Sequence, residues 1–437
     1  MTRILMRGGK DPFHAVSPYE TLDRDLIGQN SGNLIFAAAS HKLLSAKDVS
    51  ISVNGYSFDP KRADEVSSEY DHVVIPFANA FRAGYGSQLR RAAEFVGKLK
   101  IPAVMLSGGA QSGPDGTFEV LKSIEPDAKA LVSALLDRSS HITVRGERTA
   151  DYIKSLGFRD VLVIGCPSMT MNGPGHRVRK VVLDRDLYRV AYNIQASKDL
   201  AGPLVADIEA KAESTYIPQD WATLEQMLWA TEHFLPTRDY RLPLRMEHKQ
   251  FLNNRARFMV DASTWINYMR EMDLSVGPRI HGNVAGVLAG TPSVVLTHDS
   301  RTEELCRYHE IPYFSPEEVD KVSSLEQVLD RADYTSFNAG HTERFDRVVD
   351  FLHLNGLQTI YDTDQVSTRA SYEARIEGTA FPSAVEVAWA RKTELEVDRL
   401  RWLRQRDLAQ SKRIGELSKI IASLRRTIRD ASKIMSI

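Results

Sequence analysis

The fold is decided by the pattern in one stretch of the chain, Leu274-Ser-Val-Gly-Pro-Arg-Ile-His-Gly-Asn-Val-Ala-Gly-Val-Leu-Ala-Gly-Thr-Pro-Ser-Val-Val-Leu296. Its short apolar runs, Leu274–Val276 and Ser293–Leu296, are typical of buried strands, and Val284–Ala289 between them favours a helix. Strands joined by a helix of this length pair in parallel through a right-handed crossover. The stretch therefore predicts one βαβ unit of an α/β protein.

The same alternation runs through both halves of the chain. The predicted strands are Val49–Val53, His72–Phe77, Ala103–Leu106, Ile142–Arg145, Val161–Ile164, Val181–Leu183 and Arg189–Asn193. The predicted helices include Gln88–Leu99, Ala150–Leu156, Leu200–Ser214 and Trp221–His233. The polar segment Met171–Lys180 joins the halves. We therefore expect two facing Rossmann-like domains, 1–172 and 173–365, with mostly parallel sheets and a ligand cleft at the carboxyl ends of the strands.

The C-terminal part, 366–437, differs from the rest and predicts a long helical extension. Its apolar residues follow the 4-3 spacing of a coiled-coil seam, at Leu417, Ile421, Leu424, Ile428, Ala431 and Met435. Residues 391–437 hold 13 Lys and Arg against 6 Asp and Glu. We expect this helix to pair with a second copy of the chain, giving a homo-oligomer, or to pack back on the body of the protein. A basic amphipathic helix could also touch an anionic membrane surface.

Bulk composition indicates an ordinary globular protein. The chain has 437 residues, of which 43% are hydrophobic and 26% charged. A formal net charge of -1 argues against nucleic acid as a partner, so an anion site has to be built locally. Two cysteines cannot form a disulfide framework. The sequence shows no signal-peptide pattern and no apolar run of membrane-spanning length, so we expect a cytoplasmic protein, with the inner face of the membrane as a place of contact.

Two strand-to-helix junctions carry the chemistry. The first is Thr143-Val-Arg-Gly-Glu-Arg-Thr149, and the second is Val276-Gly-Pro-Arg-Ile-His-Gly-Asn283. A helix N-terminus presents free N–H groups to phosphate or carboxylate, and an arginine there adds a planar pair of donors. Arg145 could instead be a surface residue or serve a structural carboxylate, and His281 could be a core histidine. One arginine on each half, Arg145 and Arg279, would hold a dianion from both sides of the cleft.

Several stretches together resemble the polysaccharide pyruvyl transferase family. The segment from Gly277 to Cys306 is similar to its signature, an Arg-apolar-His element followed by a small-residue helix, a Gly-x-Pro turn and a strand. Three further segments agree with the family in the same order along the chain: Asn30-Ser-Gly-Asn33, Val144-Arg145 with Thr149 and Gly157, and Ile164-Gly-Cys-Pro-Ser168. A departure lies at Pro76-Phe-Ala-Asn-Ala-Phe81, where many members carry a glycine-rich turn, although Gly108-Gly109 follows the next strand.

The resemblance implies a GT-B type fold and phosphoenolpyruvate as the donor of a pyruvyl group. It implies that Arg145 and Arg279 bind the donor, and that His281 is the general acid/base beside Arg279. The substrate-binding residues that we expect besides these are Asn33, Gly282, Asn283, His298 and Asp299. No metal or cofactor is expected. The acceptor would be a sugar of a polysaccharide or of its lipid-linked precursor, and a ketal would form as phosphate leaves.

Two other functions fit the same sequence. One is a GT-B glycosyltransferase that uses a nucleotide sugar, and the other is a non-catalytic scaffold that uses the terminal helix. Asp-x-Asp pairs, which could hold a metal for a nucleotide sugar, occur at 23–25, 184–186 and 362–364, but such short patterns arise often by chance. Aromatic residues that could stack on a sugar, yet are more often core, are Tyr216, Trp221, Trp229, His233 and Trp265.

Overall fold

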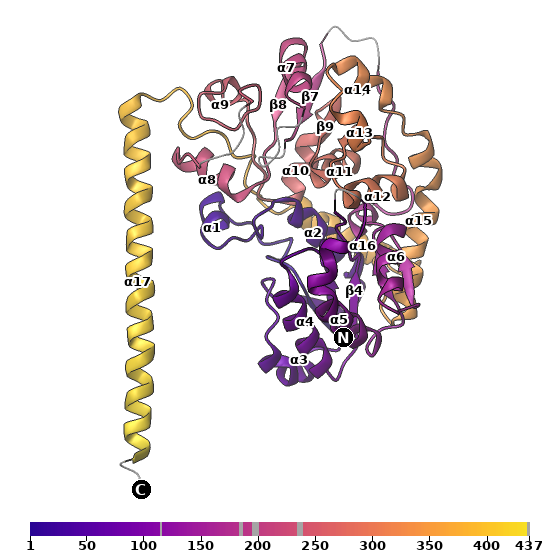
Figure 1. Ribbon diagram of the computed structural model, residues 1–437, viewed down its shortest axis with the longest axis vertical. Coiled ribbons are helices and arrows are strands. Elements are labelled where there is room, and N and C mark those ends of the chain that lie inside the picture. Colours follow the sequence, from indigo (N-terminus) through magenta and orange to yellow (C-terminus); the bar gives the residue numbers. More distant parts are fainter. Residues whose placement is uncertain (114–115, 183–186, 195–200, 234–238, 435–437) are drawn as a thin grey trace.

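The computed structural model describes residues 1–113, 116–182, 187–194, 201–233 and 239–434, with the backbone alone over 426–434. Figure 1 shows two α/β domains, one above the other, and a separate long helix at their side. The first domain contains a parallel four-stranded sheet in the order β2-β1-β3-β4. Its strands are β1 (Thr2–Met6), β2 (Val49–Val53), β3 (His72–Pro76) and β4 (Ala103–Leu106). A parallel pair, β5 (Ile142–Val144) and β6 (Val161–Val163), continues it through a bridge between Gly108 and Val144.

The second domain contains a parallel five-stranded sheet in the order β11-β10-β9-β7-β8. Its strands are β7 (Arg189–Tyr192), β8 (Glu213–Tyr216), β9 (Leu274–Gly277), β10 (Ser293–Leu296) and β11 (Tyr313–Phe314). Two facing Rossmann-like domains with parallel sheets, the GT-B arrangement, are thus confirmed.

Helices cover both sheets because the strands are buried on both faces. In the first domain they are α1 (Pro18–Asp23), α2 (Gly32–Leu44), α3 (Ala63–Glu69), α4 (Gly86–Lys98), α5 (Glu125–Leu136) and α6 (Glu147–Ser155). In the second they are α7 (Gly202–Lys211), α8 (Trp221–Trp229), α9 (Lys249–Leu252), α10 (Ala262–Arg270), α11 (Ile280–Leu288), α12 (Ser300–His309), α13 (Pro316–Val319) and α14 (Leu325–Arg331). Short 3-10 helices lie at Pro60–Arg62, Glu119–Ile124 and Pro167–Thr170.

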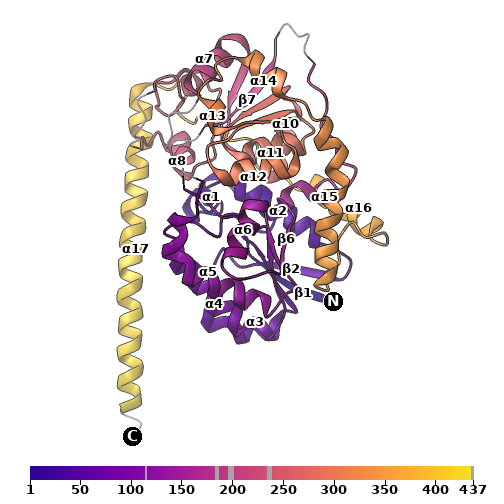
Figure 2. The same cartoon turned by 45° about the vertical axis from the view of Figure 1, so that its right-hand side comes forward.

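The predicted boundary at residue 365 differs from the structure, because the chain returns to the first domain before it. Helix α15 (Thr335–Leu354) runs down from the second domain onto the first (Figure 2). Its Phe351 and Leu352 pack with Ile4 and Met6 of β1 in one apolar cluster. Apolar side chains therefore hold the two domains together through an element that follows the second domain in sequence.

The predicted extension 366–437 also starts on the body of the protein. Helix α16 (Val366–Glu377) lies against α2, where Lys42 forms an ion pair with Glu373. The following segment packs into the core of the second domain through Val385, Val387 and Trp389. Only α17 (Glu394–Ile434) leaves the body, and Figure 1 shows it extending far past the first domain.

Two parts of the strand and helix prediction were wrong. Residues 213–214 were predicted as the end of a helix, but they begin the edge strand β8. This strand has four residues, too few for the alternation of apolar and polar residues to identify it. Val181–Leu183, predicted as a strand, is not one over residues 181–182, and residue 183 lies outside the described part. Strand β1 was missed, because only Ile4, Leu5 and Met6 mark it as apolar.

Candidate functional site

Arg145 is a buried cation at the end of β5. Its backbone N–H donates to the Gly108 carbonyl at 3.0 Å, and the residue is only 2% exposed. Burial lowers the pKa of its guanidinium group. Among the described residues, its Nε and Nη2 atoms have no hydrogen-bond partner. A buried donor left without a partner is costly, so this guanidinium group is suited to an anion that is not part of the chain.

Arg279 occupies the N-cap position of α11, opposite Arg145 across the domain boundary. Its backbone N–H donates to Asn193 Oδ1 at 2.7 Å, which fixes the turn between β9 and α11. Its guanidinium group is half-buried and pairs with the carboxylate of Asp220, the residue before α8. Burial raises the pKa of Asp220, and Arg279 opposes that rise. Arg279 therefore already holds one carboxylate, and would share its donors with a ligand.

His281 follows Arg279 and lies at the contact of the two domains. A Cβ atom at Gly32, the first residue of α2, would come within 2.7 Å of the His281 Cβ, so only glycine fits there. The imidazole meets the Phe36 ring edge-on at 6.1 Å, and its Nε2 lies 3.9 Å from Cys166 Sγ. The histidine is thus held between α2, the segment after β6, and the start of α11.

Three arginines act on this imidazole. Burial is the largest cause that lowers the pKa of His281, followed by the charges of Arg145, Arg301 and Arg279, and together they bring it to about 3. Arg145 comes from the first domain, and the other two come from the second. Their charges therefore meet at a single histidine, which is neutral at pH 7 and can accept a proton.

Arg301, Arg82 and Arg7 extend the positive charge, and sequence reasoning missed them. Burial lowers the pKa of Arg82, and both Arg301 and Arg7 lower it too. The Arg82 guanidinium group stacks on the Tyr85 ring at 3.9 Å. Arg301 lies in the stretch that resembles the family signature, five residues after the strand β10. Arg82 and Arg7 belong to no motif, because only the packing of separate loops brings them together.

Asp299 is an anion that contacts this cluster through Arg301. It caps α12, where its Oδ1 accepts from the Thr302 N–H at 2.8 Å, and its Oδ2 lies 3.1 Å from Arg301 Nη2 and 3.4 Å from His298 Nε2. Burial alone would raise its pKa, but Arg301, His298 and the Thr302 hydrogen bonds together lower it to about 2. Asp299 stays ionised and orients Arg301 and His298, so capping is one of its roles.

Three predicted residues shape the backbone around the site. Asn283 is fully buried, and its amide donates to the carbonyls of Gly277 and Arg279, at 2.8 and 3.2 Å, while Ser275 Oγ donates to its Oδ1. Asn33 donates to the carbonyls of residues 27 and 28. A Cβ at Gly282 would meet Asn193 Nδ2 at 2.8 Å. These residues position Arg279 and the loop before α2, and substrate contact by them stays a prediction.

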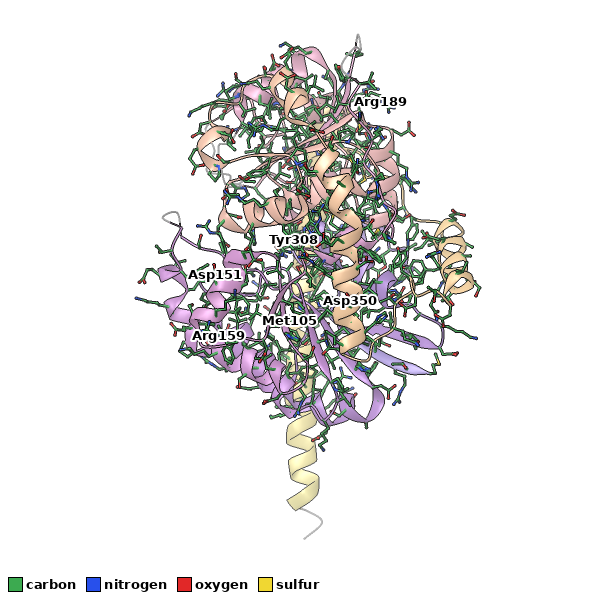
Figure 3. All side chains as sticks on the ribbon, turned by 90° about the vertical axis from the view of Figure 1, so that its right-hand side faces the viewer. Met105, Asp151, Arg159, Arg189, Tyr308 and Asp350 are labelled. Carbon is green, nitrogen blue, oxygen red and sulfur yellow. The ribbon has the colours of Figure 1, made fainter. Side chains whose placement is uncertain are left out.

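The N-terminus of α6 already holds a carboxylate. Glu304 of α12 accepts from the Thr149 N–H at 3.0 Å and from its hydroxyl at 2.6 Å. A Cβ at Gly146 would meet the Glu304 side chain at 2.8 Å. The sequence predicted an anion at this helix start, and the anion there is a side chain of the other domain. Tyr308 of α12 strengthens the same junction, donating to the Val163 carbonyl at 3.2 Å (Figure 3).

The aromatic and acidic residues singled out from sequence have mainly structural surroundings. Tyr216 and Trp265 are fully buried core residues, and Trp221 donates to the Leu22 carbonyl at 2.8 Å. The Asp362 carboxylate accepts from Thr359. The pair at 184–186 lies outside the described residues. Within the described chain, no group of three or more acidic, histidine or cysteine side chains could hold a metal ion, and no helix is long and apolar enough to cross a membrane.

Comparison with solved structures finds two sugar enzymes that are distantly similar to this chain. A UDP-GlcNAc 2-epimerase of Methanocaldococcus jannaschii is 11% identical, with a TM-score of 0.42, over 81% of this chain and 99% of that one. The glycosyltransferase SnogD of Streptomyces nogalater is 12% identical, with a TM-score of 0.31, over 86% and 99%. A search of curated proteins by sequence finds no match.

The family comparison is decisive. The sequence profile of the polysaccharide pyruvyl transferase family matches residues 30–300. This range covers more than half of the chain and includes the Arg145 and Arg279 junctions together with His281. The chain therefore belongs to the polysaccharide pyruvyl transferase family.

Proposed function

We propose that this protein transfers the pyruvyl group of phosphoenolpyruvate onto two hydroxyl groups of a sugar. The observation that carries the proposal is the buried Arg145, whose Nε and Nη2 have no hydrogen-bond partner in the described part of the chain and whose charge acts on the same imidazole as those of Arg279 and Arg301. Phosphoenolpyruvate carries a phosphate and a carboxylate a few bonds apart. A small ligand with two anionic ends matches cations that converge from both domains.

The residues divide the reaction between them. A sugar hydroxyl adds to C2 of the enol while C3 takes up a proton. The bond from C2 to the phosphate oxygen breaks, and a second hydroxyl closes the ketal ring. Of the two hydroxyl protons released, one balances the proton on C3 and the other leaves with phosphate. Neutral His281 accepts the proton of the attacking hydroxyl, a role worth roughly 10²–10⁴-fold in rate, and the arginines stabilise the departing phosphate.

The setting that we propose is a membrane surface. The acceptor would be a sugar of a polysaccharide under synthesis or of its lipid-linked precursor, at the inner face of the cytoplasmic membrane. The basic residues of α17 support this setting, because Lys and Arg near an anionic bilayer are attracted to it. Pairing of α17 with a second copy would place two active sites in one assembly.

A panel of ligands in thermal unfolding tests the donor. A ligand that binds only the folded state raises its melting temperature. We expect phosphoenolpyruvate to stabilise the wild type and not Arg145→Met. Arg148→Met is the matched control, because Arg148 lies three residues along, is exposed, and should leave the shift intact. Stabilisation by UDP- or GDP-sugars in place of phosphoenolpyruvate would identify a glycosyltransferase, and no shift with any ligand would indicate a scaffold.

A further inference from the structure

A cavity lies between the domains, beside the helix that packs on His281. It has a volume of about 670 Å³, within the range of small-molecule sites. Its walls come from Gly9 and Lys10 after β1, from α2, from the start of α10, and from α16 with the segment 379–384. Helix α2 is shared, since Gly32 meets His281 while Leu34 and Ala37 line the cavity.

An ion pair is buried in the wall of this cavity. Lys10 and Asp261 are bonded to each other, with 5% and 2% of their side chains exposed. Lys10 Nζ also donates to the His14 carbonyl at 3.2 Å. The second carboxylate oxygen, Asp261 Oδ2, is buried and has no hydrogen-bond partner in the part of the chain that the structure describes. A buried acceptor in this state normally finds a donor, in the protein or in a ligand.

The position of Asp261 makes the missing bond more telling. Asp261 is the N-cap of α10, where an aspartate side chain usually accepts from its own helix. Here the carboxylate makes no such bond and faces Lys10. Burial raises its pKa to about 6, against the effect of Lys10. Asp261 therefore makes no capping hydrogen bond to α10, and its Oδ2 atom can accept a hydrogen bond from a ligand.

The remaining walls suit a neutral, polyhydroxylated ligand. Lys42 is paired with Glu373, so both lysines of the cavity have a carboxylate partner and no net positive charge is left for an anion. Tyr56, Tyr372 and Phe381 add ring surfaces to the lining. Rings that are apolar on the face, together with a few fixed polar groups, are the surroundings that a sugar needs.

We infer that this cavity is a sugar subsite, in which a hydroxyl group of the ligand donates to Asp261 Oδ2 and the ring packs against Tyr372. That the sugar is part of the acceptor rests on the proposed function. Residues that follow β1 and β2, namely Gly9, Lys10 and Tyr56, line the cavity, and α2 lies between it and His281. The subsite would hold a sugar unit next to the one that receives the pyruvyl group.

The test measures sugar binding and donor binding separately. Ligand-observed NMR with neutral monosaccharides and disaccharides of glucose, galactose and N-acetylmannosamine is run on the wild type, Asp261→Asn and Ala380→Trp. Ala380 is exposed and lines the cavity, so tryptophan there fills it without touching the core. Ala374→Trp is the matched control, being exposed on α16 and outside the lining.

We expect at least one sugar to bind the wild type and Ala374→Trp. The same sugar should bind Asp261→Asn and Ala380→Trp with an affinity at least about 10-fold lower. The melting-temperature rise with phosphoenolpyruvate should be the same in all four proteins. If no sugar binds the wild type, or if both cavity variants bind as well as it does, the subsite is overturned. Sugar binding as expected without any phosphoenolpyruvate response would instead leave the subsite standing and refute the donor.

Discussion

At the scale of single residues, the two site arginines differ in what holds them. Arg145 is buried without a hydrogen-bond partner among the described residues, whereas Arg279 is paired with Asp220. Removing a buried cation that has no carboxylate partner removes its desolvation free energy from the folded state. Removing one member of an ion pair leaves the charge of the other member uncompensated. Arg145→Met should therefore melt no lower than the wild type without ligand, and Arg279→Met should lose about 1–3 kcal/mol of stability.

Chemical denaturation of both variants checks this contrast. Adding Asp220→Asn to Arg279→Met should recover most of the loss, because the uncompensated carboxylate is then gone. A marked destabilisation by Arg145→Met would mean that its guanidinium group is satisfied within the protein. Both arginine variants should lose activity, by roughly 10²-fold or more.

His281 makes a prediction for the pH dependence of the free enzyme. Its pKa lies near 3 because of burial and the three arginines, well below the ordinary value near 6.5. The imidazole is therefore already neutral at pH 5, and kcat/KM should show no acid limb from this group between pH 5 and 8. His281→Gln should lower kcat by roughly 10²–10⁴-fold. An acid limb near pH 6.5 that disappears in His281→Gln would show that the imidazole titrates normally.

The candidate site residues could be selected from the sequence, but not what they contact. Arg145, Arg279 and His281 could be found because they follow strands within recognisable motifs. The pairing of Arg279 with Asp220, the Glu304 carboxylate at the start of α6, and the neighbours Arg7 and Arg82 depend on long-range packing. No local pattern in the chain encodes such contacts.

At the scale of elements, α17 contacts the body near its start, and the rest of the helix extends away from it (Figure 1). Its apolar residues Leu417, Ile421 and Leu424 are 50%, 49% and 56% exposed. The other seam residues, 428, 431 and 435, have side chains outside the described part. Near its start Arg404 binds Glu225 and Asp23, which anchors the helix to the body. The sequence predicted a helix here from its spacing, and the structure contains one of 41 residues.

We predict that α17 pairs with α17 of a second copy through this seam. Leu424→Glu should shift the mass of the full chain in solution from oligomer to monomer, since a buried carboxylate opposes pairing. Ser423→Glu adds the same charge one position away, off the seam, and should leave the mass unchanged. Light scattering after size-exclusion chromatography measures both. If the wild type is a monomer and sediments with anionic vesicles, the exposed face of α17 binds a membrane and not a second copy of the chain.

At the scale of the whole molecule, buried histidines make stability depend on pH. Burial lowers the pKa of His41 and His176 to about 4, that of His281 to about 3, and that of His309 well below its ordinary value. The unfolded chain binds protons at these groups below about pH 6.5, while the folded protein does not. Their stability contribution is thus complete above pH 6.5 and is lost as the pH falls towards 4.

Melting temperatures at pH 7 and pH 5 measure this effect. Asp261 acts in the opposite direction, because its pKa is raised to about 6 and the folded state gains its proton first. Burial also raises the pKa of Asp220 and Glu304. The histidines with a lowered pKa, which also include His72, His248 and His341, outnumber these three carboxyl groups, so we expect the melting temperature to be lower at pH 5 by several degrees. An equal or higher value at pH 5 would mean that these histidines are more accessible to water than the structure shows.

The assembly of the two domains was only partly predictable. The spacing of apolar residues predicted both sheets and the parallel pairing of their strands, because each βαβ unit is formed by residues that are close in sequence. The return of α15 to the first domain, and the interdomain contacts of Glu304 and Tyr308, join residues more than a hundred positions apart. These long-range contacts set how the two domains lie against each other, and hence the relation of Arg145 to Arg279.

Calorimetric titration of phosphoenolpyruvate tests the donor site most directly. The account predicts one binding event per chain in the wild type and in Arg148→Met, and none in Arg145→Met or Arg279→Met, since one cation from each domain is required. Binding that survives the loss of either arginine unchanged would contradict it.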